Sequence, residues 1–249
     1  MRYFISLAYK GTEFHGWQVQ PNAISIQEKI NDALSILLKQ EIRVVGAGRT
    51  DTGVHAKQMY AHFNTDIDIK CKEITFRLNS YLSDAIHIKS IFLVSDSTHA
   101  RFDAISRVYE YWLCEDKNPF LIDSAWFLYG SLNFELMNEA AGHLLQVNDF
   151  TSFAKVHTDV KTHICDVRKA FWKKMEDKWV FQIEADRYLR NMVRAIVGTL
   201  VDVGKGKLTV QQFRDIIEKK NRCAAGISAP AKGLYLVKIN YPEDLINAK

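Results

Sequence analysis

Residues 46–55 read Gly46-Ala47-Gly48-Arg49-Thr50-Asp51-Thr52-Gly53-Val54-His55 and are the most informative stretch of the chain. They follow an apolar segment, 42–45, that predicts a strand. The glycines allow positive φ angles and close approach of another backbone. The spacing does not fit a dinucleotide-binding GxGxxG motif, because an Asp stands at the third glycine position, and no GK[ST] of a P-loop follows.

Asp51 lies at the tip of this predicted loop. A carboxylate in that place is expected to meet a ligand, and a nearby positive group such as Arg49 would keep it ionised, as a nucleophile requires. The alternative is a structural turn in which Asp51 only caps backbone N–H groups. The chemistry of the loop alone does not decide between the two.

The first part of the chain alternates strands and helices around this loop. Alternating apolar residues predict strands over 2–9, 58–63 and 86–94, and a helix is expected over 74–82. Ser25 and Glu28 form a capping box that predicts a helix start. The buried face of that helix is predicted from apolar residues at helical spacing, namely Ile26, Ile30, Ala33, Leu34, Leu37 and Leu38.

The second part repeats a similar order of elements. We expect strands at 108–114 and 234–239, a hairpin of 167–172 with 179–185, and helices at 134–145 (capped by Asn133), 189–203 and 210–219. This order predicts an α+β fold of two similar lobes, 1–103 and 104–249. Their mixed, mainly antiparallel sheets are expected to join into one central sheet covered by helices, with the active-site cleft between the lobes.

The composition is that of a globular protein. Its small positive net charge permits an anionic partner but does not require one. The chain has 249 residues, 47% of them hydrophobic, and a net charge of +4. Four cysteines without a CxxC pair indicate reduced thiols, and no His or Cys spacing resembles a zinc site. No apolar stretch is long enough for a membrane helix. We expect a cytoplasmic protein with no membrane association, no metal and no cofactor.

Several motifs, in one order along the chain, resemble the tRNA pseudouridine synthase A family. Residues 46–56, GAGRTDTGVHA, are similar to its signature, with Thr52 where Ala is common. Residues 9–18 resemble its opening pattern, although Lys10 replaces the usual Asp. Further similar segments are 25–28, 99–104, 107–111, 148–153, 191–198 and 233–236.

The resemblance implies an isomerase that converts uridine to its C-glycoside isomer without a cofactor. It makes Asp51 the catalytic carboxylate and Arg194 its ionic partner, with Arg49 a nearer alternative. It implies that Tyr109 contacts the substrate, with Tyr111 as a second candidate, and that Leu236 is an apolar wall for the base, although a core role for Leu236 is equally open. It also implies uridines at positions 38, 39 and 40 of the tRNA anticodon stem-loop as targets, and a homodimer.

Basic residues point to an RNA-binding face. On the helix predicted over 189–203, Arg187, Arg190 and Arg194, at spacings of three and four, are expected to form a stripe opposite its apolar face, although a solvated basic face is the alternative. Arg101 and Arg107, with Phe102 nearby, add charge and a ring that can stack on a base. Trp17 in the first loop is expected either to face RNA or to lie in the core.

Three other functions stay open from the sequence alone. The first is a pseudouridine synthase that acts on another RNA. The second is a non-catalytic RNA-binding protein on the same scaffold, which the nucleophile motif at Asp51 argues against, because binding alone needs no nucleophile. The third is an α+β enzyme for a small molecule, which the many basic residues disfavour.

Overall fold

A computed structural model describes residues 1–156, 158 and 160–246. Its contacts divide the chain into two compact units. Unit 1 contains Met1–Ile105 together with the segment from Tyr235 onward, and unit 2 contains Ser106–Leu234. Among the described residues, no helix is long and apolar enough to cross a membrane.

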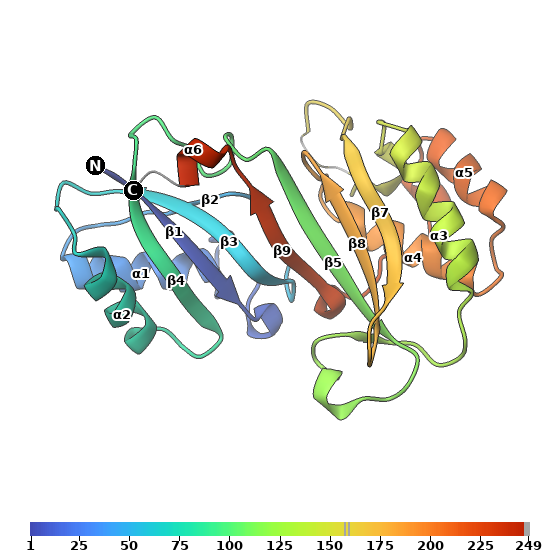
Figure 1. Cartoon of the computed structure of the whole chain (residues 1–249), viewed down its shortest axis with the longest axis horizontal. Coiled ribbons are helices and arrows are strands. Elements are labelled where there is room, and N and C mark those ends of the chain that lie inside the picture. The colour runs from blue at the N-terminus through green and yellow to red at the C-terminus, as the bar shows by residue number, and fades with distance from the viewer. Residues whose placement is uncertain (157, 159, 247–249) are drawn as a thin grey trace. The chain divides into compact units, whose positions relative to one another are not determined.

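Unit 1 is built on a sheet with the strand order β4–β1–β3–β9 (Figure 1). β1 (Arg2–Tyr9) runs antiparallel to both β3 (His55–Asn64) and β4 (Ile86–Val94). β9 (Leu234–Asn240) joins parallel to β3, and the short β2 (Val45–Gly46) pairs with the same strand. Two helices, α1 (Ile26–Leu38) and α2 (Cys71–Tyr81), contact each other, and α2 packs along β4. A short helix, α6 (Glu243–Ile246), follows β9.

The capping box predicted for α1 is confirmed. The Ser25 hydroxyl accepts the Glu28 N–H at 3.2 Å, and the Glu28 carboxylate accepts the Ser25 N–H at 3.4 Å. The predicted apolar face is buried except at Leu37, which is half-buried. The start and orientation of this helix are therefore set by local sequence.

The strand predicted over 42–45 is wrong for most of its length, since only Val45 pairs with β3. Side chains of α1 bind the backbone of this segment instead. The Ile42 N–H donates to the Ser35 hydroxyl at 2.9 Å, and the Val44 N–H donates to the Asn31 amide oxygen at 2.8 Å. These backbone groups are satisfied without a strand partner.

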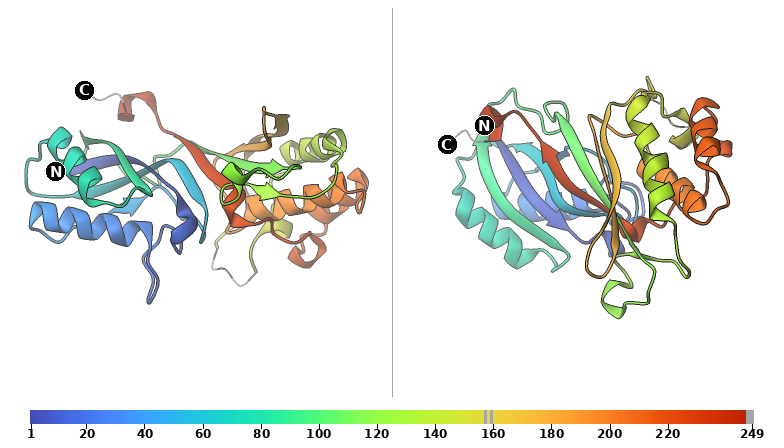
Figure 2. Two further views of the ribbon diagram at one scale, coloured as in Figure 1. Left: turned by 90° about the horizontal axis from the view of Figure 1, so that it is seen from below. Right: turned by 45° about the vertical axis from the view of Figure 1, so that its right-hand side comes forward.

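Unit 2 contains an antiparallel sheet of β5 (Ser106–Cys114), β8 (Trp179–Ala185) and β7 (Val167–Lys174). The short β6 (Trp126–Phe127) pairs parallel to β5. Three helices contact one another, and Figure 2 shows them gathered beside β7: α3 (Phe134–Gly142), α4 (Met192–Gly204) and α5 (Val210–Glu218). The predicted hairpin and the Asn133 cap of α3 are confirmed.

The α+β class with mainly antiparallel strand pairing is confirmed. The chain passes from unit 1 to unit 2 at Ile105, close to the boundary expected after residue 103. It then returns to unit 1 at Tyr235, whereas the second lobe was expected to run from 104 to 249. The reason is the pairing of β9 with β3, which no local pattern reveals.

Candidate active site

Asp51 lies in the short loop between β2 and β3, and its side chain is half-buried. The loop closes through a turn in which the backbone carbonyl of Asp51 accepts the Val54 N–H at 3.1 Å. Gly53 takes the positive φ of 77° that this turn requires. The main chain therefore closes this turn.

The loop between β1 and α1 fixes the backbone beside Asp51. The Trp17 N–H donates to the Thr50 carbonyl at 3.2 Å, and the hydroxyls of Tyr9 and Thr50 share a hydrogen bond of 2.8 Å. Gly16 has a φ of 86°, and a Cβ there would lie 2.3 Å from the Thr50 oxygen. Only glycine therefore allows this approach, and the two loops form one rigid layer.

Trp17 is 1% exposed, so the core alternative for this residue is the one observed. Its ring lies against Gly46, where a Cβ would be 2.5 Å from the indole. Trp17 thus supports the glycine-rich segment from below instead of presenting a surface to RNA.

His55 ends the loop and is buried where β3 begins. Its Nδ1 accepts the Gly11 N–H at 3.0 Å, and its ring stacks on Tyr235 of β9 with centroids 4.6 Å apart. Leu236, the next residue of β9, pairs in register with Ala56 and is 2% exposed. Arg49 is exposed.

Tyr109 of β5 is half-buried, and the ring of Tyr188 meets it edge-on with centroids 5.0 Å apart. The Tyr188 hydroxyl lies 3.1 Å from the Arg107 carbonyl and 3.0 Å from the Ile183 carbonyl. Burial, followed by the neighbouring Tyr109, raises the pKa of Tyr188 well above its ordinary value. Tyr188 is therefore a neutral phenol that holds the position of the Tyr109 ring.

Tyr111, the second tyrosine candidate, has no exposed surface. Its hydroxyl donates to the Pro230 carbonyl at 2.8 Å, and burial raises the pKa of Tyr111 well above its ordinary value. The side chain is part of the core of unit 2, so a substrate cannot reach it in this structure.

Arg194 lies in the first turn of α4 and is half-buried. Its Nε donates to the Ala229 carbonyl at 2.7 Å, while its own carbonyl accepts the Ala229 N–H at 2.9 Å. At Gly198, one turn further along, a Cβ would lie 1.8 Å from the Ile227 oxygen. The segment before β9 therefore lies directly on α4 and fixes the direction of the Arg194 side chain.

The predicted arginine stripe is wrong, because α4 begins only at Met192. Asn191 has a φ of 66°, which interrupts the helical path, so Arg187 and Arg190 lie in the preceding loop. The Asp186 carboxylate shapes this loop by accepting the Arg187 N–H at 2.7 Å. The Arg187 guanidinium reaches the Thr162 carbonyl at 3.3 Å, whereas Arg190 is exposed.

The other two predicted RNA-binding arginines lie in different units. Arg107 belongs to unit 2, and its guanidinium donates to the Asp186 carbonyl at 2.7 Å. Arg101 belongs to unit 1 and is exposed, with its guanidinium carbon 5.8 Å from the centre of the Phe102 ring. Arg107 therefore has a structural contact in addition to any role toward RNA.

Known proteins match the chain along almost its whole length. Residues 140–242 match the tRNA pseudouridine synthase family. tRNA pseudouridine synthase A of Bacteroides thetaiotaomicron is 52% identical over 249 residues, which cover 99% of this chain and 93% of that protein. The enzyme of the same name from Porphyromonas gingivalis is 52% identical over 98% of both chains, and that of a Thermoanaerobacter species is 40% identical over 95% of this chain and 98% of its own length.

The chain belongs to the tRNA pseudouridine synthase A family.

The match to the tRNA pseudouridine synthase family over 140–242 contains Arg187, Arg190, Arg194 and Leu236. Asp51 and Tyr109 lie before this range, in the part of the chain that the full-length relatives cover.

Sequence reasoning missed several residues that support the site of this tRNA pseudouridine synthase A family member. Tyr9, His55 and Tyr235 all lie inside the motifs that resemble the family. The motifs therefore contained these residues, but the sequence did not indicate what each one does. Tyr188 lies outside those motifs, and only its contact with Tyr109 reveals it.

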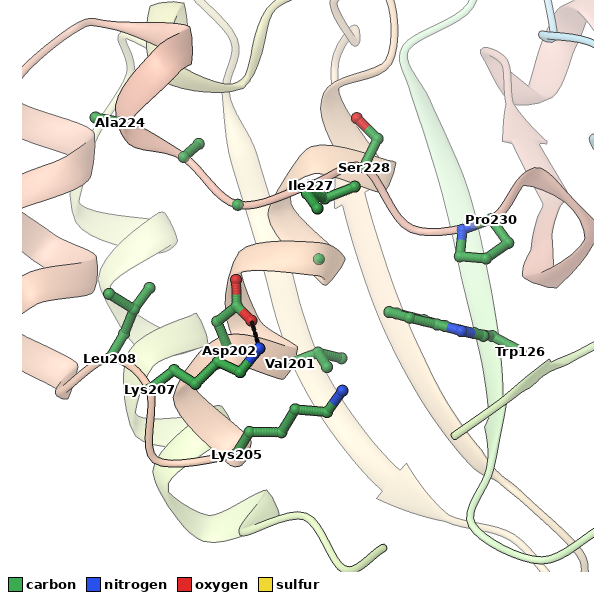
Figure 3. Close-up of a pocket in the computed structure, with 13 residues that line it drawn as sticks. Trp126, Val201, Asp202, Lys205, Lys207, Leu208, Ala224, Ile227, Ser228 and Pro230 are labelled. Atoms are coloured by element: carbon green, nitrogen blue, oxygen red, sulfur yellow. Dashed lines mark ion pairs between the residues drawn. The ribbon is translucent and has the colours of Figure 1, made fainter. Parts of the chain in front are cut away.

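A pocket of about 500 Å³ in unit 2 lies beside the second half of α4 (Figure 3). Trp126, Ile227 and Pro230 line one part of it, and a 3.8 Å ion pair of Lys207 with Asp202 lines another. None of the predicted site residues lines this pocket.

Proposed function

We propose that this protein isomerises uridine to pseudouridine in tRNA, at one or more of positions 38, 39 and 40 of the anticodon stem-loop. The observation that carries the proposal is Asp51, a half-buried carboxylate on a loop that neighbouring backbone holds rigid. A nucleophile gains from such fixed placement, because no ordering is needed when the substrate arrives. Full-length relatives named tRNA pseudouridine synthase A support the choice of substrate.

The reaction conserves every atom of the substrate. The bond from uracil N1 to C1′ breaks, the base turns, and a bond from C5 to C1′ forms. A proton leaves C5 and N1 gains one, so no co-substrate is consumed. The protein must supply a carboxylate nucleophile, an everted nucleotide and a site closed to bulk water.

Each predicted site residue has a proposed part in this chemistry. Asp51 attacks the base or the sugar of the everted uridine. Arg194, or Arg49 as the nearer alternative, provides the positive charge that keeps Asp51 ionised. Tyr109 stacks on the uracil and is positioned to transfer a proton, and Leu236 is an apolar wall for the base.

The arginines of the two units are proposed to hold the tRNA backbone. They are Arg101, Arg107, Arg187 and Arg190. Guanidinium groups suit phosphate because they donate two parallel hydrogen bonds. Tyr111 is left out of the proposed contacts, since it is buried in the core.

We further propose a homodimer that works in the cytoplasm. The dimer follows from the resemblance to the family, and light scattering of the protein with and without tRNA measures it. Four free cysteines, two of them buried, suit a reducing compartment.

The proposal is tested by Asp51→Asn, which keeps the size of the side chain but removes its charge. We expect pseudouridine formation to fall by about a thousandfold or more, as for loss of a nucleophile, while the affinity for tRNA stays within a few-fold. Asp66→Asn, at an exposed position after β3, is the matched control and leaves turnover unchanged. Turnover that survives in Asp51→Asn removes Asp51 from the mechanism.

The same assay separates the rival functions. Mapping pseudouridine in an anticodon stem-loop and in unrelated structured RNAs distinguishes a tRNA enzyme from a synthase for another RNA. Binding of tRNA by the wild-type protein without any turnover would instead indicate a non-catalytic RNA-binding protein.

A further inference from the structure

The segment that binds the Arg194 side chain has no regular structure of its own. Residues 225–230, all of which the structure describes, form neither helix nor strand. Within them, the Ala229 carbonyl accepts the Arg194 Nε at 2.7 Å, and the Ala229 N–H donates to the Arg194 carbonyl at 2.9 Å. An irregular segment lacks a ladder of hydrogen bonds, so its position depends on a few individual contacts.

Side-chain packing surrounds this segment only in part. The Gly226 N–H donates to the Thr199 hydroxyl of α4 at 3.0 Å, and the Ile227 carbonyl lies on Gly198 of the same helix. The pocket of about 500 Å³ is lined by 226–228 and Pro230, and the Ile227 side chain is 90% exposed (Figure 3). Other groups are therefore needed to keep the segment in place.

The guanidinium of Arg222 binds this segment at three points. One terminal nitrogen donates to the Gly226 carbonyl at 3.1 Å and to the Ala225 carbonyl at 3.4 Å, and the other donates to the Ser228 hydroxyl at 2.9 Å. The Arg222 side chain is half-buried. Because the guanidinium is planar and its nitrogens are fixed relative to one another, it sets the positions of all three acceptors together.

The backbone from which Arg222 extends is itself anchored in the core of unit 2. The Asn221 N–H donates to the Ser152 hydroxyl at 2.9 Å, and that hydroxyl donates to the Ile216 carbonyl of α5 at 2.6 Å. Ser152 is 1% exposed. The Arg222 guanidinium therefore connects the segment to a fixed part of the unit.

The Ser228 hydroxyl joins this support to the start of α4. It accepts the side-chain amide of Asn191 at 2.6 Å as well as the Arg222 guanidinium. Asn191 directly precedes α4, and Arg194 lies in the first turn of that helix. The hydrogen bonds of Arg222 and Asn191 thus meet one residue before Ala229, which binds Arg194.

We propose that Arg222 is a positioning residue for the isomerisation, which holds the 225–229 segment and thereby the direction of the Arg194 side chain. The inference rests on the role proposed above for Arg194. Without the guanidinium, the Ala229 carbonyl is free to shift and the Arg194 charge shifts with it. A displacement of about 1 Å at a reacting group lowers a rate by about tenfold to a hundredfold.

The test compares Arg222→Ala with Arg214→Ala. Arg214 is an exposed arginine of α5 whose guanidinium pairs with Glu218 at 3.3 Å. We expect Arg222→Ala to lower kcat about tenfold or more, with Kd for tRNA within about twofold, whereas Arg214→Ala changes neither quantity. Ser228→Ala removes the shared acceptor with a smaller change, and its kcat is expected to fall about fivefold, as for one lost hydrogen bond. Wild-type kcat in Arg222→Ala, or in Ser228→Ala where Arg222→Ala does not fold, overturns the proposal.

Arg222→Lys separates positioning from a direct contact with tRNA. Lysine keeps the charge but lacks the fork of two nitrogens. We expect it to lose nearly as much kcat as Arg222→Ala and to keep the wild-type salt dependence of tRNA binding. Restored activity in Arg222→Lys, together with a salt dependence that is weaker by about one phosphate contact in Arg222→Ala, indicates an RNA contact instead and overturns the positioning role.

A double-variant cycle with Arg194→Ala shows whether Arg222 acts through Arg194. We expect Arg222→Ala to have no further effect on kcat once the Arg194 side chain is absent, while its effect on urea unfolding is the same in both backgrounds. An equal fold-loss of kcat in both backgrounds means that Arg222 acts on general stability, and this result overturns the proposal.

Hydrogen exchange at the Ala229 amide tests the support without any turnover. We expect exchange at least about tenfold faster in Arg222→Ala than in the wild type, and no change in Arg214→Ala. If the wild type forms no pseudouridine but exchange responds in this way, the proposed function fails while the support of the 225–229 segment by Arg222 stands. If wild-type turnover is normal and neither exchange nor kcat responds to Arg222→Ala, the positioning role fails while the proposed function stands.

Discussion

Two side chains at the candidate site, Arg194 and His55, form hydrogen bonds with backbone groups distant in the sequence. Arg194 donates to the Ala229 carbonyl at 2.7 Å, and His55 accepts the Gly11 N–H at 3.0 Å. Such bonds fix a rotamer more firmly than apolar packing alone does, because they depend strongly on angle. The supporting residues therefore matter to function without touching the substrate.

The protonation of one buried residue, His62, makes the free energy of unfolding depend on pH. Burial, followed by the charge of Arg2, lowers the pKa of His62 from 6.5 to about 4. Above pH 6.5 the ring is neutral in both the folded and the unfolded chain. As the pH falls from 6.5 to 4, the unfolded chain binds a proton that the folded chain does not, so stability is lost over that window. The loss approaches about 3 kcal/mol at pH 4.

Urea unfolding between pH 7 and pH 4.5 measures this effect. We expect His62→Gln, which keeps an acceptor for the Ala100 N–H, to show a shallower decline of the unfolding free energy than the wild type. His87→Gln, at an exposed position of β4, keeps the wild-type slope. Identical slopes for His62→Gln and the wild type would exclude His62 as the group responsible.

At the scale of elements, the loop after β1 and the loop that carries Asp51 are separated in the sequence but pack directly against each other. The loop of Gly11–Trp17 lies directly on residues 50–54. This close packing requires glycine at both positions. A Cβ at Gly11 would lie 2.0 Å from the Val54 oxygen, and one at Gly16 would lie 2.3 Å from the Thr50 oxygen. The first loop therefore controls the geometry around Asp51.

Gly16→Ala tests that control. The positive φ of Gly16 costs an alanine about 1 kcal/mol, and the contact with the Thr50 oxygen forces the loop beside Asp51 to move. We expect kcat to fall about tenfold or more. Gly130→Ala is the matched control, because Gly130 has a φ of 97° and nothing within 4 Å of its Cβ position.

Gly130→Ala has the strain of a positive φ but no contact like that of Gly16 with the Thr50 oxygen. Its kcat is therefore expected to stay at the wild-type value, while its free energy of unfolding drops by about 1 kcal/mol. Single-turnover rates and thermal unfolding measure both quantities. If the two variants lose the same amount of activity, general destabilisation and not loop displacement is the cause.

At the scale of the whole molecule, unit 1 is made from two separate stretches of chain. β9 and the residue after it bring long-range contacts to residues before 106. The Ile239 N–H donates to the Gln58 amide oxygen at 2.9 Å, and the Tyr241 ring meets the ring of Tyr60 at 5.3 Å. Unit 1 therefore lacks part of its sheet and core if the chain stops at Ile105.

We expect a fragment of residues 1–105 to unfold without cooperativity, because the core side of β3 next to β9 is uncovered. A second fragment, in which a flexible Gly/Ser linker joins residues 235–246 to residue 105, is expected to unfold cooperatively. Thermal unfolding followed by circular dichroism distinguishes the two. Cooperative unfolding of 1–105 at the temperature of the joined fragment contradicts the structural role of β9.

The sequence by itself determined the features that depend on neighbours a few residues away. The α1 capping box, the hairpin of β7 and β8, the Asn133 cap and the turn that carries Asp51 all follow from local spacing and side-chain chemistry. The family motifs were likewise readable, since they are short and occur in one order.

Only the tertiary structure decided which residues meet across long separations. It buried Trp17 and Tyr111, removed Arg187 and Arg190 from α4, replaced most of the strand at 42–45 with contacts to α1, and returned β9 to unit 1. The physical reason is that burial and pairing depend on partners outside the local pattern, from 7 residues away for Ile42 and Ser35 to 119 residues away for Tyr111 and Pro230. Periodicity reports which side of an element is apolar, but not what covers it.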